Sequence, residues 1–495
     1  MILKHKNTAK LLVYAFLFLF QLQVYAQTDQ RVSSQVKDRI AQVESNLVSW
    51  VKLDSVRNWN IYQRMKELRV KGVCIAVIDN FKIDWVNSYG LADTLEGRAV
   101  TNETLFQSAS IGKSINGFAF AKLHQDKKVD LSKDINLYLH SWKFPYDNVS
   151  KGKHIDLLHI LSHTAGLTVH GFDGYKWHQP LPNLLQIING TKPANNNAVR
   201  SEIEPGIKFQ YSGGGYEISE LLLQDATHKS YEDYITTSIF KPLRMKSSTY
   251  QLKPTSGLCA TAYRFDGKDI GCKYHLYPEK ACGAGLWTTA ADLARFVIEI
   301  QLALQGKSKI LTTESARLMT TPVLETSNYA MGFFIEKRGG VRYFQHSGLN
   351  EGFSSQYYGS IENGRGVVVL INSDNMSLLE EIVNSVATVY GWPDFYSYIP
   401  KKIVNVSHDV LDRYVGSYKF ENGNSGPTIF KEHGDLYLRD PGSPTKWRMY
   451  FTSEKEFFML EARWANQQFF LDENGRVQGF YILGDNYKAV VKKLN

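Results

Sequence analysis

Apolar positions along the chain follow two periods, and each period predicts a different kind of element. Residues 70–78 and 82–89 are rich in β-branched and aromatic side chains on either side of residues 79–81, so they predict a β-hairpin. The same reading predicts a strand over 366–371 and helices over 35–53 and 378–390.

The most informative segment is a helix that begins at Ser110 and is apolar around most of its circumference. Its apolar positions are Ile111, Ile115, Phe118, Ala119, Phe120, Ala121 and Leu123. We expect such a helix to be buried. Lys113 shares a helical face with Ser110. An unpaired buried charge is costly, so a lysine on a buried helix is expected to have a function. Ser110 lies at the positive end of the helix dipole, where Lys113 can take its proton.

The Ser-x-x-Lys spacing alone does not identify a catalytic site. It recurs at Ser34, Ser49, Ser150, Ser238 and Ser443, where a solvated pair is the simpler interpretation. Two later segments distinguish Ser110 from these. One runs from Pro205 to Tyr216, with a glycine run at 213–215 before an apolar-periodic helix. The other is His346-Ser347-Gly348-Leu349-Asn350-Glu351-Gly352-Phe353, which follows one predicted strand and precedes the strand over 366–371.

These segments resemble the motifs of the serine β-lactamase and penicillin-binding-protein superfamily. The nearest resemblance is to its class C-like branch, which includes D-aminopeptidases, D-alanyl-D-alanine carboxypeptidases and esterases. The matching strings are Ser110 to Lys113 for Ser-x-x-Lys, Tyr211-Ser212-Gly213 for Tyr-x-Asn, His346-Ser347-Gly348 for Lys-Thr-Gly, and the segments Leu161 to Leu167 and Gly283 to Leu293. They follow the family's order from about Val70 to Gly391, and several weak motifs in order make a strong signal.

The resemblance implies a fold of the β-lactamase/transpeptidase type within the α+β class. We expect an antiparallel sheet flanked by helices and a helical subdomain between Ser110 and Ala281. The active site would lie between these two parts. Residues 27–400 would form this catalytic domain.

The resemblance also implies a catalytic sequence. Ser110 would attack an acyl carbon after Lys113 accepts its proton. Tyr211 would pass a proton to the leaving group and later activate water. The backbone N–H groups of Ser110 and Leu349 would form the oxyanion hole. Gly348 would keep the strand edge open so that a substrate can lie along it as an added strand.

Two positions depart from the pattern of β-lactamases. Gly213 lacks the side-chain amide that is expected to hold the acylamide carbonyl of a lactam. His346 replaces a lysine; it would contact a substrate carboxylate or support Tyr211, and its contribution would fade above neutral pH if it acts as a cation. Both departures favour D-amino peptides or small esters as substrates. A true β-lactamase is one alternative, and a non-catalytic penicillin- or peptidoglycan-binding protein is another.

The pattern changes after residue 401 to short strands separated by turns. Pro393 and Pro400 mark a linker. Strands are predicted over 416–420, 427–430, 435–438, 447–451, 457–460 and 467–471, with a hairpin turn at Asn474-Gly475. Residues 401–495 therefore predict a small antiparallel β-barrel, and they resemble the lipocalin-like domain carried by some class C-like hydrolases.

The first 26 residues have the form of a cleavable signal peptide, which predicts a secreted or periplasmic protein. Three lysines precede the apolar run at 11–20, and Val24 and Ala26 fit a cleavage site. Cleavage would lower the net charge from +8 to +5. The sequence has no basic run dense enough to predict nucleic-acid binding. No apolar run after the first 26 residues is long enough to predict a membrane span. The expected partner is a small-molecule or peptide substrate, with cell-wall peptides among the candidates.

The remaining side chains with possible chemistry do not predict a cofactor or a metal. His159 and His163 have the spacing of a helical metal pair, but no third ligand is readable beside them. Cys74 lies in an apolar strand and is expected to be a buried free thiol. A bridge between Cys259 and Cys272 stays open, because nothing in the sequence sets the separation of their Cα atoms.

Overall fold

The computed structural model describes residues 33–53, 58–255, 257–397, 399–441, 446–460, 466–484 and 487–494. The predicted signal peptide lies outside these residues. The described residues up to Gln42 belong to one compact unit, and those from Val43 onward belong to another. Helix α2 (Ser34–Ser45) is shorter than the helix predicted over 35–53. That prediction was wrong at its end, because Leu47 bridges to Trp59 and β1 (Val51–Leu53) pairs in parallel with β11 (Ile399–Lys401).

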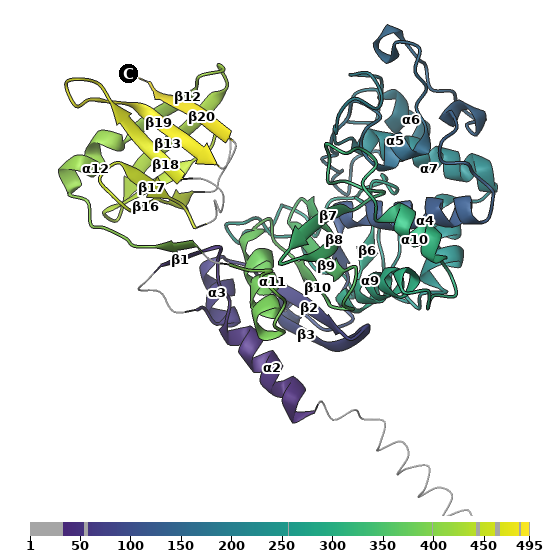
Figure 1. Cartoon of the computed structure of the whole chain (residues 1–495), viewed down its shortest axis with the longest axis horizontal. Coiled ribbons are helices and arrows are strands. Elements are labelled where there is room, and N and C mark those ends of the chain that lie inside the picture. Colours follow the sequence, from purple (N-terminus) through teal and green to yellow (C-terminus); the bar gives the residue numbers. More distant parts are fainter. Residues whose placement is uncertain are drawn as a thin grey trace, which may run out of the picture. The chain divides into compact units, whose positions relative to one another are not determined.

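A seven-stranded antiparallel sheet is the centre of the larger unit (Figure 1). Its strands, in spatial order, are β4 (Arg98–Ala99), β3 (Lys82–Asp93), β2 (Gly72–Asp79), β10 (Gly366–Ile371), β9 (Phe353–Ser360), β8 (Val341–Asn350) and β7 (Phe334–Arg338). The predicted hairpin is β2 and β3, and Asn80 and Phe81 form its turn. The predicted strand over 366–371 is β10, which lies at the middle of the sheet.

Helices cover both faces of this sheet. All residues of β10 are buried, which requires cover on each side. Helix α9 (Ala290–Leu304) packs on β2, β3, β9 and β10, while α11 (Ser377–Val389) packs on β9 and β10. The layered arrangement confirms the predicted α+β class, and α11 confirms the helix predicted over 378–390.

A mainly helical part occupies the sequence between Ser110 and Ala281, as predicted (Figure 1). Its helices are α4 (Gly112–Gln125), α5 (Leu157–Leu161), α6 (Leu184–Asn189), α7 (Gly213–Thr227) and α8 (Tyr231–Ile235), with short helical turns η2 (Ile135–Leu137), η3 (Asn148–Ser150) and η4 (Thr236–Phe240). The other short elements of the catalytic region are α3 (Ile61–Glu67), α10 (Thr313–Met319) and the paired strands β5 (Phe106–Gln107) and β6 (Trp287–Thr288).

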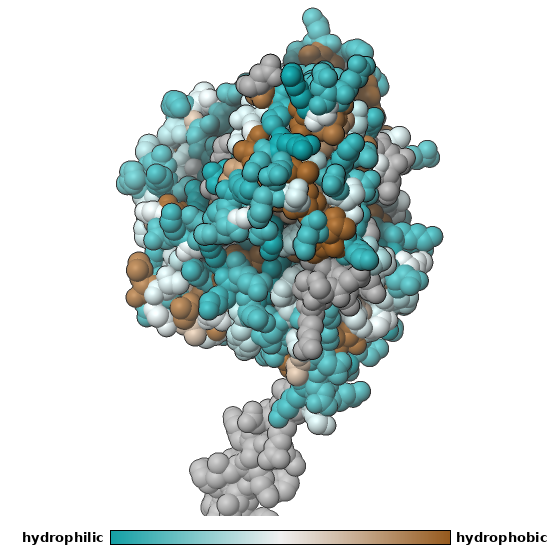
Figure 2. All heavy atoms as spheres, turned by 90° about the vertical axis from the view of Figure 1, so that its left-hand side faces the viewer, coloured by the Kyte–Doolittle hydropathy of each residue, from teal (hydrophilic) through white to brown (hydrophobic). Residues whose placement is uncertain are grey.

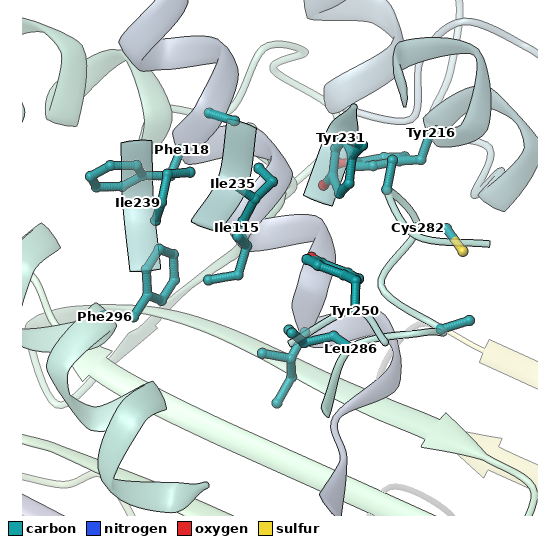
Figure 3. Packing of buried hydrophobic residues seen from close by; sticks show 14 of the residues in the cluster. Ile115, Phe118, Tyr216, Tyr231, Ile235, Ile239, Tyr250, Cys282, Leu286 and Phe296 are labelled. Atoms are coloured by element: carbon teal, nitrogen blue, oxygen red, sulfur yellow. The ribbon is translucent and has the colours of Figure 1, made fainter. Parts of the chain in front are cut away.

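Helix α4 lies in the core of this region, as its sequence predicts. Eleven of its residues are buried, Lys113 among them. Figure 3 shows Ile115 and Phe118 of α4 packed among side chains from α8, η4 and α9. The phenyl rings of Phe118 and Phe296 have centroids 5.8 Å apart. A helix held on all sides in this way gives Ser110 and Lys113 a rigid support.

The C-terminal residues form a nine-stranded, nearly closed antiparallel sheet with its own core. Helix α12 (His408–Tyr414) precedes it. In spatial order the strands are β15 (Trp447–Arg448), β14 (Asp435–Arg439), β13 (Ser425–Glu432), β12 (Gly416–Phe420), β20 (Tyr487–Lys493), β19 (Val477–Gly484), β18 (Asn466–Leu471), β17 (Glu456–Phe458) and β16 (Tyr450–Phe451). The two outermost strands follow each other directly in the chain. This arrangement confirms the predicted small antiparallel barrel, and Asn474-Gly475 forms the β18–β19 turn.

The face seen in Figure 2 is mostly hydrophilic, with hydrophobic residues in small separate patches. No helix within the described ranges is both long and apolar enough to cross a bilayer.

Candidate active site

Ser110 lies in a tight turn directly before helix α4. The turn is η1 (Ala109–Ile111), and the α-helix itself begins at Gly112. Ala109 has a φ of +49°, a left-handed conformation that is strained for a residue with a Cβ. Ser110 is partly exposed, whereas Lys113, one turn later, is buried. The turn therefore presents the serine hydroxyl to solvent above a buried lysine.

Two side chains meet at the Ser110 hydroxyl. Lys113 Nζ donates to Ser110 Oγ at 3.2 Å, and Tyr211 Oη donates to the same oxygen at 2.9 Å. Lys113 Nζ also donates to the Cys282 carbonyl at 2.7 Å and lies 4.8 Å from the centre of the Tyr211 ring. The structure therefore brings Tyr211, which is distant in the sequence, to the Ser110–Lys113 pair, at distances that allow proton transfer among the three residues.

Tyr211 is held in place by His163. The two rings have centroids 4.1 Å apart, and His163 Nδ1 accepts the backbone N–H of Ser212 at 3.0 Å. Ser212 in turn caps α7, because its Oγ accepts the backbone N–H of Gly215. Burial and the nearby positive charge of Lys113 hold the pKa of His163 well below its usual value. His163 is therefore a neutral packing partner of Tyr211.

Strand β8 contains the segment from His346 to Asn350, which the sequence placed after a strand. A Cβ added to Gly348 would lie 2.1 Å from the Ser108 carbonyl oxygen and 3.0 Å from the Ser110 nitrogen. Ser355 Oγ on β9 donates to the same Ser108 carbonyl at 2.7 Å. Only a glycine at position 348 allows the nucleophile turn to approach the strand this closely. Gly348 thus serves close packing of the turn, a role that differs from the expected open edge.

An open edge nevertheless exists one residue later on β8. Strand β7 pairs with β8 only up to Gln345, and the β8–β9 hairpin closes with the pair Asn350 and Phe353. Paired residues of an antiparallel ladder alternate in the direction of their backbone groups. The backbone N–H and C=O of Leu349 therefore face the side that β7 leaves free.

His346 is buried and neutral. Its Nδ1 donates to the Ser347 carbonyl at 2.6 Å, so Nε2 accepts the hydroxyl of Tyr329 at 3.0 Å. Burial, assisted by the charge of Lys113, lowers the pKa of His346 to about 3. The expectation that His346 could supply a positive charge near neutral pH was wrong, because the ring is removed from water beside an existing cation. Its hydrogen-bond partner is Tyr329, and the structure gives it no hydrogen bond to Tyr211.

Gly213 is buried at the start of α7, and an aromatic ring covers it. A Cβ added there would lie 3.0 Å from Phe172 Cε2. Phe172 also lines a cavity of about 650 Å³ that reaches Leu349. The apolar lining residues are Phe172, Phe265, Tyr277 and Leu349, and the charged ones are Asp173, Arg264, Asp266, Glu351 and Asp374. The Phe172 ring therefore limits the space that a side-chain amide at position 213 would enter.

The residues considered for metals and disulfides have other contacts. His159 lies 3.1 Å from an oxygen of Asp156, with which it forms the capping box of α5. Cys259 and Cys272 are both free thiols, as are Cys74 and Cys282. Burial raises the pKa of Cys74 to about 11, which makes it an unreactive packing residue.

A family comparison now identifies the chain. The family model described as Beta-lactamase matches residues 59–384. The chain belongs to the β-lactamase family. This confirms the resemblance seen in the sequence, and the members of this family are serine hydrolases.

Curated proteins and solved structures agree with this assignment. Protein flp of Staphylococcus aureus strain N315 is 26% identical over 331 residues, which are 64% of this chain and 63% of that protein. The chain thus spans less than two thirds of the length of that relative. Among solved structures, an octameric penicillin-binding protein homologue from Pyrococcus abyssi has a TM-score of 0.60 at 20% identity, covering 87% of this chain and 98% of its own. The D-amino acid amidase of Ochrobactrum anthropi SV3 has a TM-score of 0.56 at 20% identity, covering 72% of this chain and 98% of its own.

Sequence reasoning missed four groups around Ser110: the Cys282 carbonyl, Tyr329, Phe172 and the face of His163. Only His163 had a signal, since it lies within the matching string from Leu161 to Leu167. A backbone carbonyl has no signature in a sequence, because every residue carries one. Tyr329 and Phe172 lie in segments that match no motif.

Proposed function

We propose that this protein is a secreted serine hydrolase that works through an acyl-enzyme on Ser110. The observation that supports this most directly is the position of Ser110 Oγ within hydrogen-bond distance of both Lys113 Nζ and Tyr211 Oη. A serine hydroxyl is a weak nucleophile until a base takes its proton, and two candidate proton carriers lie beside this one.

The proposed reaction has two stages. In acylation, Lys113 in its neutral form accepts the Ser110 proton while Oγ forms a bond to the acyl carbon. The bond to the leaving group then breaks, and Tyr211 supplies the proton that the leaving nitrogen or oxygen requires. In deacylation, Tyr211, which has given up its proton, takes one from water, and this water attacks the ester. The bond to Ser110 Oγ then breaks, and Lys113 returns to Oγ the proton that it accepted, which restores the starting form.

The oxyanion would be held by backbone N–H groups. The Ser110 nitrogen lies close to strand β8, since a Cβ at Gly348 would be 3.0 Å from it. The Leu349 N–H faces the same open side of that strand. Donors aimed at the developing charge stabilise the transition state more than the ground state. The Leu349 carbonyl, on the same side, is free to accept an N–H from an extended substrate.

We expect D-amino peptides or small esters to be better substrates than β-lactams. Gly213 offers no side-chain donor to an acylamide, and a missing hydrogen bond to a buried polar group costs about 1–3 kcal/mol. His346 is neutral and supplies no charge for a lactam carboxylate. The fold is shared with a D-amino acid amidase, which supports the inclusion of D-amino acyl amides among the test substrates.

The decisive experiment tests the nucleophile with the purified mature protein. Ser110→Ala should abolish labelling by a fluorophosphonate and lower turnover by on the order of 10³-fold or more. Lys113→Ala should have nearly the same effect, because the two residues act as a unit. Wild-type labelling rates in Ser110→Ala would refute the assignment. Circular dichroism should show an unchanged fold, since the substitution removes one oxygen and leaves almost no cavity.

Substrate class is tested by comparing kcat/KM for D-alanyl peptides, short p-nitrophenyl esters and a chromogenic cephalosporin. We expect the cephalosporin to be the poorest of the three. The double variant Gly213→Asn with Phe172→Ala should raise its relative rate, because the shortened Phe172 leaves room for the new amide. A wild-type preference for the cephalosporin over every ester and D-peptide would contradict the substrate proposal without affecting the role of Ser110.

A further inference from the structure

Three glutamates are buried together behind the catalytic residues. Glu217 and Glu220 lie on α7, and Glu279 lies in the segment that leads to Cys282. Their exposed fractions are 0%, 4% and 0%. Buried carboxyl groups are costly unless they form hydrogen bonds, so their contacts indicate what they do.

Two of these carboxyl groups hold one short loop, residues 279–283. Glu217 Oε1 accepts the backbone N–H of Cys282 at 2.9 Å, and Glu220 Oε2 accepts that of Ala281 at 3.2 Å. The Cys282 carbonyl accepts Lys113 Nζ at 2.7 Å. A single residue of backbone therefore connects the Glu217 carboxyl to the Lys113 amine, which is itself bonded to Ser110. Figure 3 shows Cys282 on this loop at the margin of the buried cluster.

The loop also rests directly on the nucleophile turn. A Cβ added to Gly112 would lie 2.4 Å from Gly283 Cα, and one added to Gly283 would lie 2.3 Å from the Ala109 carbonyl oxygen. Gly283 has a φ of +90°, which suits glycine. Because the contact is backbone against backbone, any shift of the loop changes the position of the Cys282 carbonyl relative to Lys113.

We propose that Glu217 is a positioning residue for Lys113. By holding the Cys282 N–H it keeps the Cys282 carbonyl in place, and that carbonyl directs the amine toward Ser110. This inference rests on the proposed function, since it concerns the efficiency of the same base.

The other two glutamates differ from Glu217 in what they contact. Glu220 binds the amide of Ala281, one residue before the carbonyl that meets Lys113. Neither carboxyl oxygen of Glu279 has a hydrogen-bond partner among the described residues. Burial raises the pKa of Glu217 to about 7 and that of Glu279 to about 8. A glutamine at 217 can still present a carbonyl oxygen to Cys282, whereas a methionine cannot.

The test compares Glu217→Gln, Glu217→Met and the matched control Glu279→Gln, which alters a buried carboxyl of the same cluster without touching the chain of hydrogen bonds. The measurements are the rate at which a fluorophosphonate phosphonylates Ser110, with loss of fluoride, and the rate at which a p-nitrophenyl ester acylates it, both at a fixed pH. We expect Glu217→Gln and Glu279→Gln to stay within about threefold of wild type. Glu217→Met should acylate about tenfold or more slowly, with little change in KM.

The two substitutions at position 217 separate positioning from general destabilisation. Both remove the Glu217 carboxylate, but only the glutamine keeps an oxygen that can hold the Cys282 N–H. We therefore expect a loss of kcat in Glu217→Met that Glu217→Gln restores, with the KM of the ester little changed in both.

Folding and the basic assignment are checked separately. Circular dichroism establishes that each variant is folded, and Glu217→Thr, which is too short to reach Cys282, replaces the methionine variant if that one does not fold. A folded Glu217→Met or Glu217→Thr that acylates at the wild-type rate would overturn the inference. Equal losses in Glu217→Gln and Glu217→Met would do the same. Failure of Ser110→Ala to abolish labelling would instead refute the proposed function.

Discussion

At the scale of single residues, burial sets the charge of the side chains around Ser110. Lys113, His163 and His346 share one small region. The two histidine rings are neutral there, because burial and the charge of the lysine both lower their pKa values. The hydrogen bonds of His346 to Ser347 and Tyr329 agree with a neutral ring. His346 therefore orients neighbouring groups and does not attract anions.

This neutrality predicts how substrate preference depends on pH. Burial and the charge of Lys113 lower the pKa of His346 to about 3, so the ring stays neutral from pH 5 to pH 8. The ratio of kcat/KM for p-nitrophenyl hemisuccinate over p-nitrophenyl butyrate should stay constant over that range. Any ionisation that affects both esters equally cancels in the ratio. A tenfold fall in the ratio toward pH 8 would contradict a neutral His346, and His346→Lys should raise the ratio.

At the scale of elements, the site depends on how closely a turn and a strand approach each other. The turn η1 reaches β8 at Gly348, and it reaches the loop of residues 279–283 at Gly283. Ser108 is buried between β8 and β9, where its carbonyl accepts a hydrogen bond from Ser355. Backbone contact on both sides leaves the turn little freedom, which keeps Ser110 Oγ aligned with Lys113 and Tyr211.

Gly348→Ala should therefore displace the nucleophile turn. The new methyl group would lie 2.1 Å from the Ser108 carbonyl oxygen, a backbone atom that cannot yield without moving Ser110. A displacement of about 1 Å can cost on the order of 10²-fold in rate, and we expect a loss of that size in fluorophosphonate labelling. Gly171→Ala is the control, because its methyl group would meet no atom within 4 Å. Equal labelling of the two variants would show that the turn tolerates the shift.

At the scale of the whole molecule, two large hydrophobic cores among the described residues come from separate stretches of sequence. One is composed of residues between 74 and 370, and the other of residues between 411 and 491. A small third cluster joins Val51 to Phe458 and Leu460. Strand β11 ends at Lys401 and pairs with β1, so it completes the catalytic part before the barrel begins. We propose a boundary near residue 401, with residues 27–400 as the catalytic domain and 401–495 as the barrel domain.

A protein that ends after Lys401 should consequently fold and keep its nucleophile. It retains β11 and the whole catalytic core, and a domain with its own core can fold alone. We expect circular dichroism to show a cooperative melt and the fluorophosphonate labelling rate to remain within about threefold of the full chain. Loss of cooperative melting would show that the barrel is required for folding. A normal labelling rate with altered kcat/KM for peptides would place the barrel in substrate selection.

The sequence by itself determined the elements with strong periodicity and the order of the motifs. The hairpin of β2 and β3, the buried helix α4 and the turn at Asn474-Gly475 follow from apolar period and turn chemistry, which are local properties. The spacing of Ser110 and Lys113 on one helical face is local too. The family of the protein could be recognised from the sequence because its motifs are also local: each is short, and they occur in a fixed order.

The tertiary structure alone decided which groups complete the site and what charge they carry. The predicted helix over 35–53 ended early because β1 pairs with β11, a strand some 350 residues away. The Cys282 carbonyl, Phe172 over Gly213 and the neutral state of His346 arise from contacts between distant segments. Burial and electrostatic neighbours depend on the packed fold, so no pattern in the sequence could reveal them.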